Sequence, residues 1–196
     1  MNIDRDPAAL CTYAYRRSLV GAPWQFTLDA DGIDWVRGTK FGHIPFRGVR
    51  RVRMSYRPAN LQTHRFMTEL WAEGAPKLEI LSSSWKSLVE QERLDGPYAA
   101  FVAELHRRIA LAAPPARFEQ GSHPFRYWPG LVLFVGVSLA AALLIVRALQ
   151  AHAQGGAAII GAFLALFLWQ DGNYFRRNRP ALYRPEAIPA EVLPKL

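Results

Sequence analysis

Two apolar runs in the last third of the chain constrain its fold more than any other feature. Residues 129–146 contain no charged side chain over eighteen positions, and residues 155–169 contain none over fifteen. A helix of about 20 apolar residues, with a range of about 17–25, can cross the hydrocarbon core of a bilayer. The second run reaches this length when it is extended through residue 175. The sequence therefore predicts a transmembrane hairpin over residues 129–175, with spans at about 129–147 and 155–173.

The residues that flank this hairpin predict its orientation. Aromatic and basic side chains stand where each span meets the membrane interface: Arg126, Tyr127, Trp128, Trp169, Arg176, Arg177 and Arg179. The loop between the spans carries only Arg147. Because cytoplasmic flanks are enriched in Lys and Arg, we expect a multi-pass protein of the inner (cell) membrane with both termini in the cytoplasm. Asp171 is expected near the interface, where the second span ends. Small residues would let the two helices approach closely, namely Gly130, Gly136, Ser138, Gly155, Gly156 and Gly161.

The part of the chain before the hairpin has the pattern of an antiparallel β domain. Seven short runs that favour strands follow one another between residues 12 and 83, separated by turns rich in Gly, Pro, Asp and Asn. The period then changes to that of an amphipathic helix over residues 98–112, whose apolar stripe is Tyr98, Phe101, Val102, Leu105 and Ile109. Residues 84–95 are expected to form a connecting loop or a short extra helix.

The local text of this region resembles that of bacterial PH-like membrane proteins. The matching stretches are FTLDADGIDWVRGTKFGHIPFRGVRRVRMSYR, WAEGAPKLEILSSS and PYAAFVAELHRRI. Within them, Ile44-Pro45-Phe46-Arg47-Gly48-Val49 resembles the start of a strand in that family, and Ala100-Phe101-Val102 with Leu105 resembles its closing helix. The resemblance covers residues 12–112 and implies a domain that binds lipid, peptide or protein. Many of these relatives place their hairpin before the PH-like domain, whereas here it follows.

Together these patterns predict an α+β chain. Its fold class is a PH-like antiparallel β-barrel of about seven strands, capped by one C-terminal helix and followed by a two-helix transmembrane hairpin. The expected organisation is an N-terminal extension over 1–11, the PH-like domain over 12–112, a linker over 113–128, the hairpin over 129–175, and a basic, Pro-rich cytoplasmic tail over 176–196.

A basic run in the fifth predicted strand is the best candidate for a binding site, with the residues Arg47, Arg51, Arg53 and Arg57. Strand alternation places Arg51, Arg53 and Arg57 on a wet face together with Val49, and Arg50 on the buried face with Val52. Guanidinium groups on one face could hold phosphate through bidentate contacts. The alternative is a solvated face that protects a sheet edge from aggregation.

The sequence lacks the usual signatures of catalysis and metal binding. It has one cysteine, Cys11, and five dispersed histidines without ligand spacing. Ser82, Ser83 and Ser84 are not set in a nucleophile elbow. No glycine-rich phosphate loop occurs, and the N-terminus has no apolar core of signal-peptide length. We therefore expect no catalytic residue, no metal, no cofactor and no enzyme activity.

The net charge of +8 fits a protein beside anionic lipid, and with two spans in the chain nucleic acid is not an expected partner. The sequence predicts a membrane-anchored PH-like module at the cytoplasmic face of the inner membrane. Its expected partners are the bilayer, anionic lipid headgroups and an unidentified protein. The alternative is an accessory subunit of a membrane enzyme or transporter whose chemistry or transport uses the hairpin.

Overall fold

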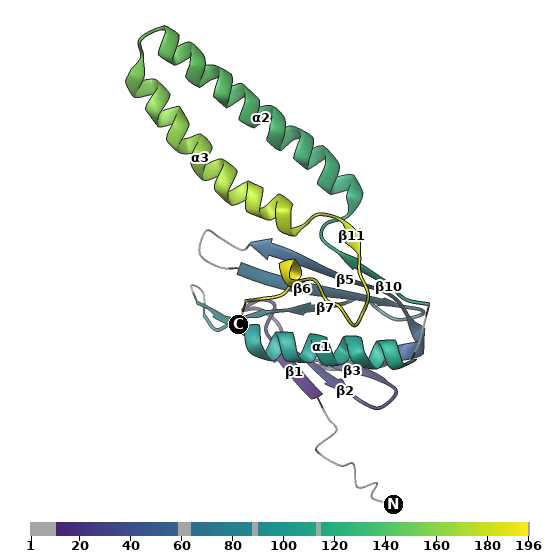
Figure 1. The fold of residues 1–196 in the computed structure, drawn as a ribbon. Coiled ribbons are helices and arrows are strands. Elements are labelled where there is room, and N and C mark those ends of the chain that lie inside the picture. The colour runs from purple at the N-terminus through teal and green to yellow at the C-terminus, as the bar shows by residue number, and fades with distance from the viewer. Residues whose placement is uncertain (1–10, 59–63, 88–89, 113–114, 196) are drawn as a thin grey trace, which may run out of the picture. The chain divides into compact units, whose positions relative to one another are not determined.

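A computed structural model describes residues 11–58, 64–87, 90–112 and 115–195 (Figure 1). The chain forms two compact units. One, here the β unit, comprises the described residues up to Gln120 and the segment from Ala181 onward. The other, the hairpin unit, is Gly121–Pro180. The β unit is thus assembled from chain on both sides of the hairpin.

The first four strands of the β unit form an antiparallel sheet in the order of the chain. They are β1 (Cys11–Tyr15), β2 (Trp24–Leu28), β3 (Gly32–Arg37) and β4 (Lys40–Pro45). The tight turn between β3 and β4 depends on Gly38, whose φ of +60° is a conformation that side chains with a Cβ rarely adopt. Alternate residues of these strands point inward, so Tyr13, Tyr15 and Phe26 are buried.

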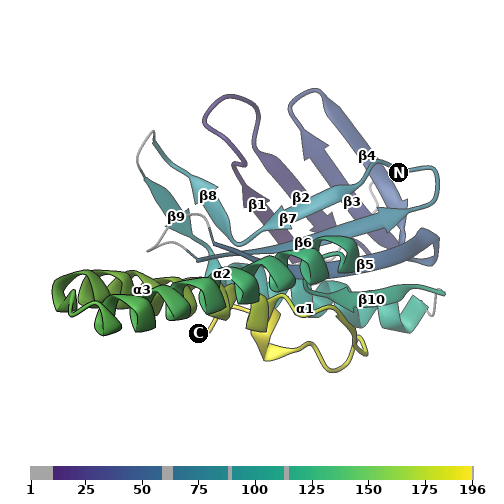
Figure 2. The same ribbon diagram turned by 90° about the horizontal axis from the view of Figure 1, so that it is seen from above.

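A second sheet contains five strands in the order β11-β10-β5-β6-β7. The antiparallel core of this sheet is β5 (Val49–Pro58), β6 (His64–Ala72) and β7 (Leu78–Leu81), and a 3₁₀ turn, η2 (Phe46–Gly48), leads into β5. Strand β10 (Arg117–Gln120) joins the edge of β5 in parallel, and β11 (Ala181–Leu182) pairs with β10. Figure 2 shows β1–β4 running across the direction of β5 and β6.

One helix, α1 (Asp95–Ala112), supplies the core between the two sheets. The predicted stripe is buried: Tyr98, Phe101, Val102, Leu105 and Ile109 are at most 1% exposed. The Phe101 ring lies 5.4 Å from the ring of Tyr13 in β1, and the Tyr98 hydroxyl lies 2.7 Å from that of Thr68 in β6. The helix therefore contacts both sheets, as its amphipathic pattern requires.

The α+β class is confirmed, since the seven predicted runs correspond to β1–β7 and the predicted helix to α1. The strands do not close into one barrel: in the described chain they pair as separate sheets of four, five and two strands. The two-stranded sheet, β8 (Ser83–Trp85) with β9 (Gln91–Arg93), lies where a loop or short helix was expected. Strand β10 likewise lies within the expected linker. Strands β8, β9 and β10 have only three or four residues each, which is too short for an alternating pattern to be recognised in the sequence.

A β-bulge corrects the predicted faces of β5. The register of β5 against β6 shifts between Val49 and Arg51. An extra residue in one strand reverses the alternation of the residues before it. Val49 is consequently buried, whereas Arg50 is exposed and pairs with Glu73. The assignment of Val49 to the wet face and of Arg50 to the buried face was wrong.

The segment after the hairpin folds onto the β unit. Besides β11, it contributes Tyr183, whose amide donates to the carbonyl of Phe118 at 3.1 Å, and the turn η3 (Ala190–Val192), which packs on β5. Val192 is fully buried. Ser55 and Met67, on the face of the sheet expected to be wet, are also buried. From Ala181 onward, the predicted Pro-rich tail is thus an integral part of the β unit.

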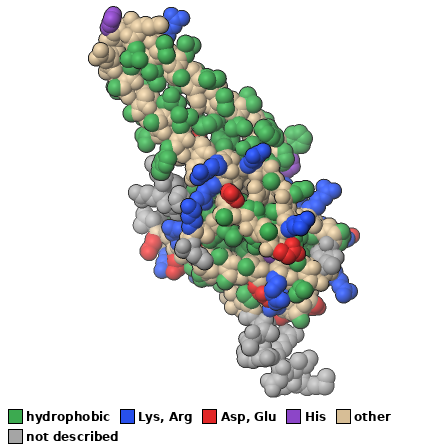
Figure 3. Space-filling view, viewed as in Figure 1, with side chains coloured by type: hydrophobic (Ala, Val, Ile, Leu, Met, Phe, Trp, Pro, Cys, Tyr) green, Lys and Arg blue, Asp and Glu red, His purple; other side chains and the backbone are tan. Residues whose placement is uncertain are grey.

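The hairpin unit consists of α2 (Pro124–Gln150) and α3 (Gln154–Arg177). At 1.5 Å per residue these helices are about 40 and 36 Å long, enough to cross a bilayer. Their most apolar windows are 0% and 6% buried. Figure 3 shows apolar side chains along the visible face of the hairpin. Such exposure is not that of the core helices of a soluble protein, and it supports membrane association.

Aromatic rings join the two helices of the hairpin. The Phe134 ring in α2 lies 5.0 Å from Phe167 and 5.1 Å from Phe175 in α3. Of the small residues predicted to bring the helices together, Gly130 does so, because a Cβ there would lie 3.5 Å from the Phe175 ring. At the other four glycines of that set, such a Cβ would meet no heavy atom of the partner helix within 4 Å: Gly136, Gly155, Gly156 and Gly161. For these four the predicted role in helix packing was wrong, because ring contacts set the spacing of the helices.

Candidate functional site

The predicted basic residues of β5 do not form one cluster. Arg47 lies in η2, before the bulge, and Arg57 lies near the other end of the strand. With a rise of about 3.3 Å per residue, Arg51 and Arg57 are already about 20 Å apart. A single phosphate group therefore cannot contact all four arginines. Each has its own surroundings, which decide whether its guanidinium is available.

Arg53 and Arg51 are engaged within the sheet. Arg53 forms an ion pair with Glu119 of β10, to which its Nε donates at 3.0 Å, and its side chain is only 12% exposed. The guanidinium of Arg51 stacks over the Trp71 ring at 4.1 Å. These contacts join β10, β5 and β6 across the outer face of the sheet. We therefore assign Arg53 a structural role. Arg51 has a stacking partner in Trp71 but no ion pair within the described chain.

Arg57 has a different neighbour, because the register of β5 and β6 places it directly opposite Arg65. No hydrogen bond or ion pair links either arginine to another residue of the described chain, and the Nε of Arg65 is buried without a partner. Burial lowers the pKa of Arg65, and the nearby guanidinium groups of Arg57 and Arg17 lower it further. The Glu79 carboxylate acts in the opposite direction, but three guanidinium groups lie near one another here, so this end of the sheet keeps an excess of positive charge.

Arg47 borders a groove beside the end of α1. The groove, of about 660 Å³, is also lined by Asp31, Phe46, Arg107 and Leu111, among others. Arg47 and Arg107 are exposed. Arg107, however, already donates through its Nε to Glu104 at 2.7 Å, and Arg108, which also lines the groove, donates to the same carboxylate. An anion in this groove would therefore meet Arg47 as its main cation.

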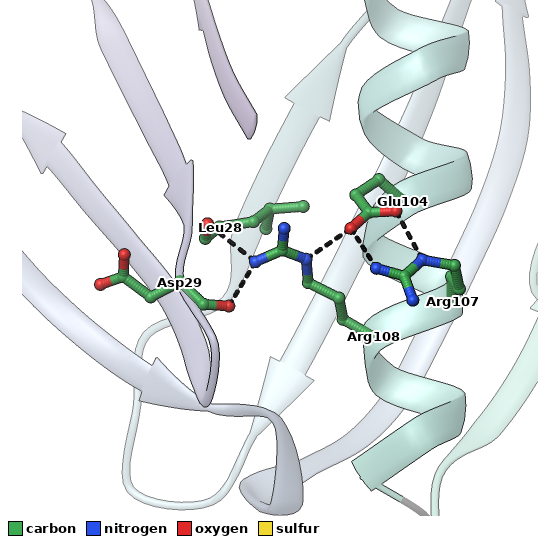
Figure 4. A network of polar contacts seen from close by, with 5 residues as sticks. All are labelled: Leu28, Asp29, Glu104, Arg107 and Arg108. Carbon is green, nitrogen blue, oxygen red and sulfur yellow. Dashed lines mark hydrogen bonds and ion pairs between the residues drawn. The ribbon is translucent and has the colours of Figure 1, made fainter. Parts of the chain in front are cut away.

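A polar network beside this groove fixes α1 to the first sheet (Figure 4). Arg108 donates through Nη1 to the carbonyls of Leu28 and Asp29, at 3.0 and 2.6 Å, and through Nε to Glu104 at 2.6 Å. Hydrogen bonds from Arg107 and then Arg108 lower the pKa of Glu104 to about 2. Because every charge here has a partner, we assign the network to structure.

The predicted interface residues gather at one end of the hairpin unit, here its base. Antiparallel helices bring the start of α2 and the end of α3 together there, and with them Arg126, Arg176, Arg177 and Arg179. The opposite end carries only Arg147. Trp128 and Trp169 are 56% and 70% exposed, and Trp169 lies eight residues before the end of α3. Tyr127 instead packs on the Phe175 ring at 5.7 Å and is buried, which places it in the helix contact.

Several residues of interest were not singled out by sequence reasoning. Alternation had placed Arg65 and Trp71 on one face of the sixth run, but only the strand register shows that they oppose Arg57 and Arg51. Glu119 lay in the presumed linker. His106 lies beside the predicted helical stripe and is fully buried. In the described parts of the chain, no group of three or more His, Cys, Asp or Glu side chains is arranged to hold a metal ion.

Comparisons with protein-family models, with curated proteins and with solved structures gave no significant match.

Proposed function

We propose that this chain is a membrane-anchored, PH-like binding module of a bacterial inner membrane. In this proposal the α2–α3 hairpin holds the protein in the bilayer, and the β unit, at the cytoplasmic face, engages an anionic lipid headgroup or a protein partner. The order of four antiparallel strands, three further strands and a closing helix supports the PH-like assignment. The short strands β8 and β9, between β7 and α1, and the strands β10 and β11, after α1, are additions to that order.

The observation that carries the proposal is the place of the hairpin in the chain. Strand β10 precedes the hairpin and β11 follows it, and the two strands pair with each other. Paired strands must lie on the same side of a membrane, so the chain between them must cross it an even number of times. Two exposed apolar helices supply two crossings. The excess of arginine at the base of the hairpin favours the cytoplasm for the β unit.

Cysteine labelling of the full chain tests this topology. In a Cys11→Ser background, Ala151→Cys places a thiol at the tip of the hairpin, and Arg184→Cys places one on the β unit; both positions are exposed. A membrane-impermeant maleimide added to intact spheroplasts should label Ala151→Cys, and should label Arg184→Cys only after lysis. Labelling of Arg184→Cys in intact cells, or release of the protein from membranes by alkaline carbonate, would contradict the proposal.

A further inference from the structure

The facing pair Arg57 and Arg65 is the least compensated charged feature of the β unit. Like charges directly opposite each other on neighbouring strands destabilise a sheet. A buried donor without an acceptor, such as the Nε of Arg65, adds a further cost. Arg51 also lies opposite an arginine, Arg117, but it stacks on Trp71. The described chain offers no comparable contact to the Arg57–Arg65 pair.

The acidic residues Glu69 of β6 and Glu79 of β7 are already engaged by other cations. Glu79 accepts from Arg17 through one carboxylate oxygen and from Lys77 through the other, both at 2.6 Å. Lys77 also contacts Glu69 at 2.8 Å. Two carboxylates are thus shared between two cations. Within the described chain neither forms a hydrogen bond or ion pair with Arg57 or Arg65, although the Glu79 carboxylate attracts the Arg65 guanidinium at longer range. Because Glu69 and Glu79 offset the charges of Arg17 and Lys77, the positive charges of Arg57 and Arg65 remain in excess.

We propose that Arg57 and Arg65 bind a phosphate monoester. The inference rests on the proposed function, since it names the ligand class of the same module. A monoester carries a charge of about −1.5 to −2 at pH 7 and offers three strong acceptor oxygens, which match two facing guanidinium groups. Each guanidinium presents parallel N–H groups that suit two such oxygens. Bound phosphate would cancel the repulsion and draw the Arg65 side chain outward, where its Nε gains an acceptor.

Two sources share this chemistry, namely a lipid with a phosphomonoester headgroup and free phosphate. The test uses the full-length protein in a neutral detergent, with thermal unfolding followed by tryptophan fluorescence. Inorganic phosphate is compared with chloride at equal ionic strength, and short-chain phosphatidic acid with short-chain phosphatidylglycerol, a diester. Because a ligand that binds only the folded state raises the melting temperature, a response to monoesters over their controls is expected.

Arg57→Gln should weaken the apparent affinity for the monoester at least about tenfold. Arg50→Gln is the matched control, since it removes the same charge from the same strand at an exposed position, and it should keep the wild-type response. Without ligand, Arg57→Gln should melt no lower than wild type, because the substitution relieves repulsion. A lower apparent affinity in Arg57→Lys, with its charge kept, would further support bidentate contact.

A tenfold preference for phosphatidic acid over inorganic phosphate would assign the site to a lipid headgroup, and equal affinity would assign it to free phosphate. An unchanged response in Arg57→Gln, or no wild-type response to either monoester, would overturn the inference. Resistance to carbonate extraction is measured on the same variants. If wild type shows no response to either monoester but stays anchored in the membrane, the site alone is rejected. If wild type responds to a monoester but is released by carbonate, the anchor alone is rejected.

Discussion

The stability of the β unit should fall between pH 7 and pH 5 because of His106. This side chain is fully buried in α1. Its Nδ1 lies 2.7 Å from the carbonyl of Val102, which can only accept, so Nδ1 carries the proton. Its Nε2 therefore accepts from the Tyr183 hydroxyl at 2.8 Å. Burial lowers the pKa of His106 to about 4 from 6.5, because the charged form loses its hydration.

The sign and size of the effect follow from this pKa. Below pH 6.5 the unfolded chain binds a proton at this histidine that the folded chain does not bind until about pH 4, so acid favours unfolding. The contribution to stability is fully present above pH 6.5 and is lost as the pH falls through 4. Each pKa unit corresponds to about 1.36 kcal/mol, which gives about 3 kcal/mol in all and about 2 kcal/mol between pH 7 and pH 5.

Urea unfolding of the full-length protein in neutral detergent at pH 7, 6 and 5 measures this loss. Ordinary carboxyl groups titrate mainly below this window, so the histidines dominate it. The control is His106→Gln, which keeps a polar side chain without a titration and should show a nearly flat profile over the same range. If wild type and His106→Gln lose the same stability between pH 7 and pH 5, the assignment of the pH dependence to His106 is wrong.

Three further substitutions test the packing. Phe101→Ala should lower the free energy of unfolding by about 3–5 kcal/mol in a urea titration, since it leaves a cavity between the helix and the first sheet, and a loss below 1 kcal/mol would contradict that packing. Arg53→Gln should cost about 1–3 kcal/mol because it leaves the Glu119 carboxylate without its partner. Arg50→Gln, in an exposed pair, should leave the free energy of unfolding nearly unchanged, and equal losses in the two variants would refute the distinction. Gly121→Ala should lower the melting temperature, because φ is +78° and a Cβ would lie 2.3 Å from the Asn178 carbonyl oxygen, and an unchanged melting temperature would count against this close approach.

Period and composition were enough to predict the main elements. The charge-free runs gave the two long helices, because a helix that crosses a bilayer must be apolar over its whole length. The alternation of residues 12–83 gave seven strands, and the stripe of Tyr98, Phe101 and Leu105 gave α1 with its buried face. These features depend on residues close together along the chain, so the sequence alone is enough to predict them.

The tertiary structure decided which charged residues are available. Arg53 became structural through Glu119, which lies 66 residues further along the chain, and Arg57 met Arg65 through strand register. The bulge at Arg50 exchanged the buried and exposed faces at the start of β5. Tyr183, which follows the hairpin in the chain, forms a hydrogen bond with His106 of α1. No local period encodes these pairings, because each depends on the register of strands or on contacts between distant segments. The sequence by itself determined the elements of this protein, and long-range pairing determined which of its charges are left without a partner.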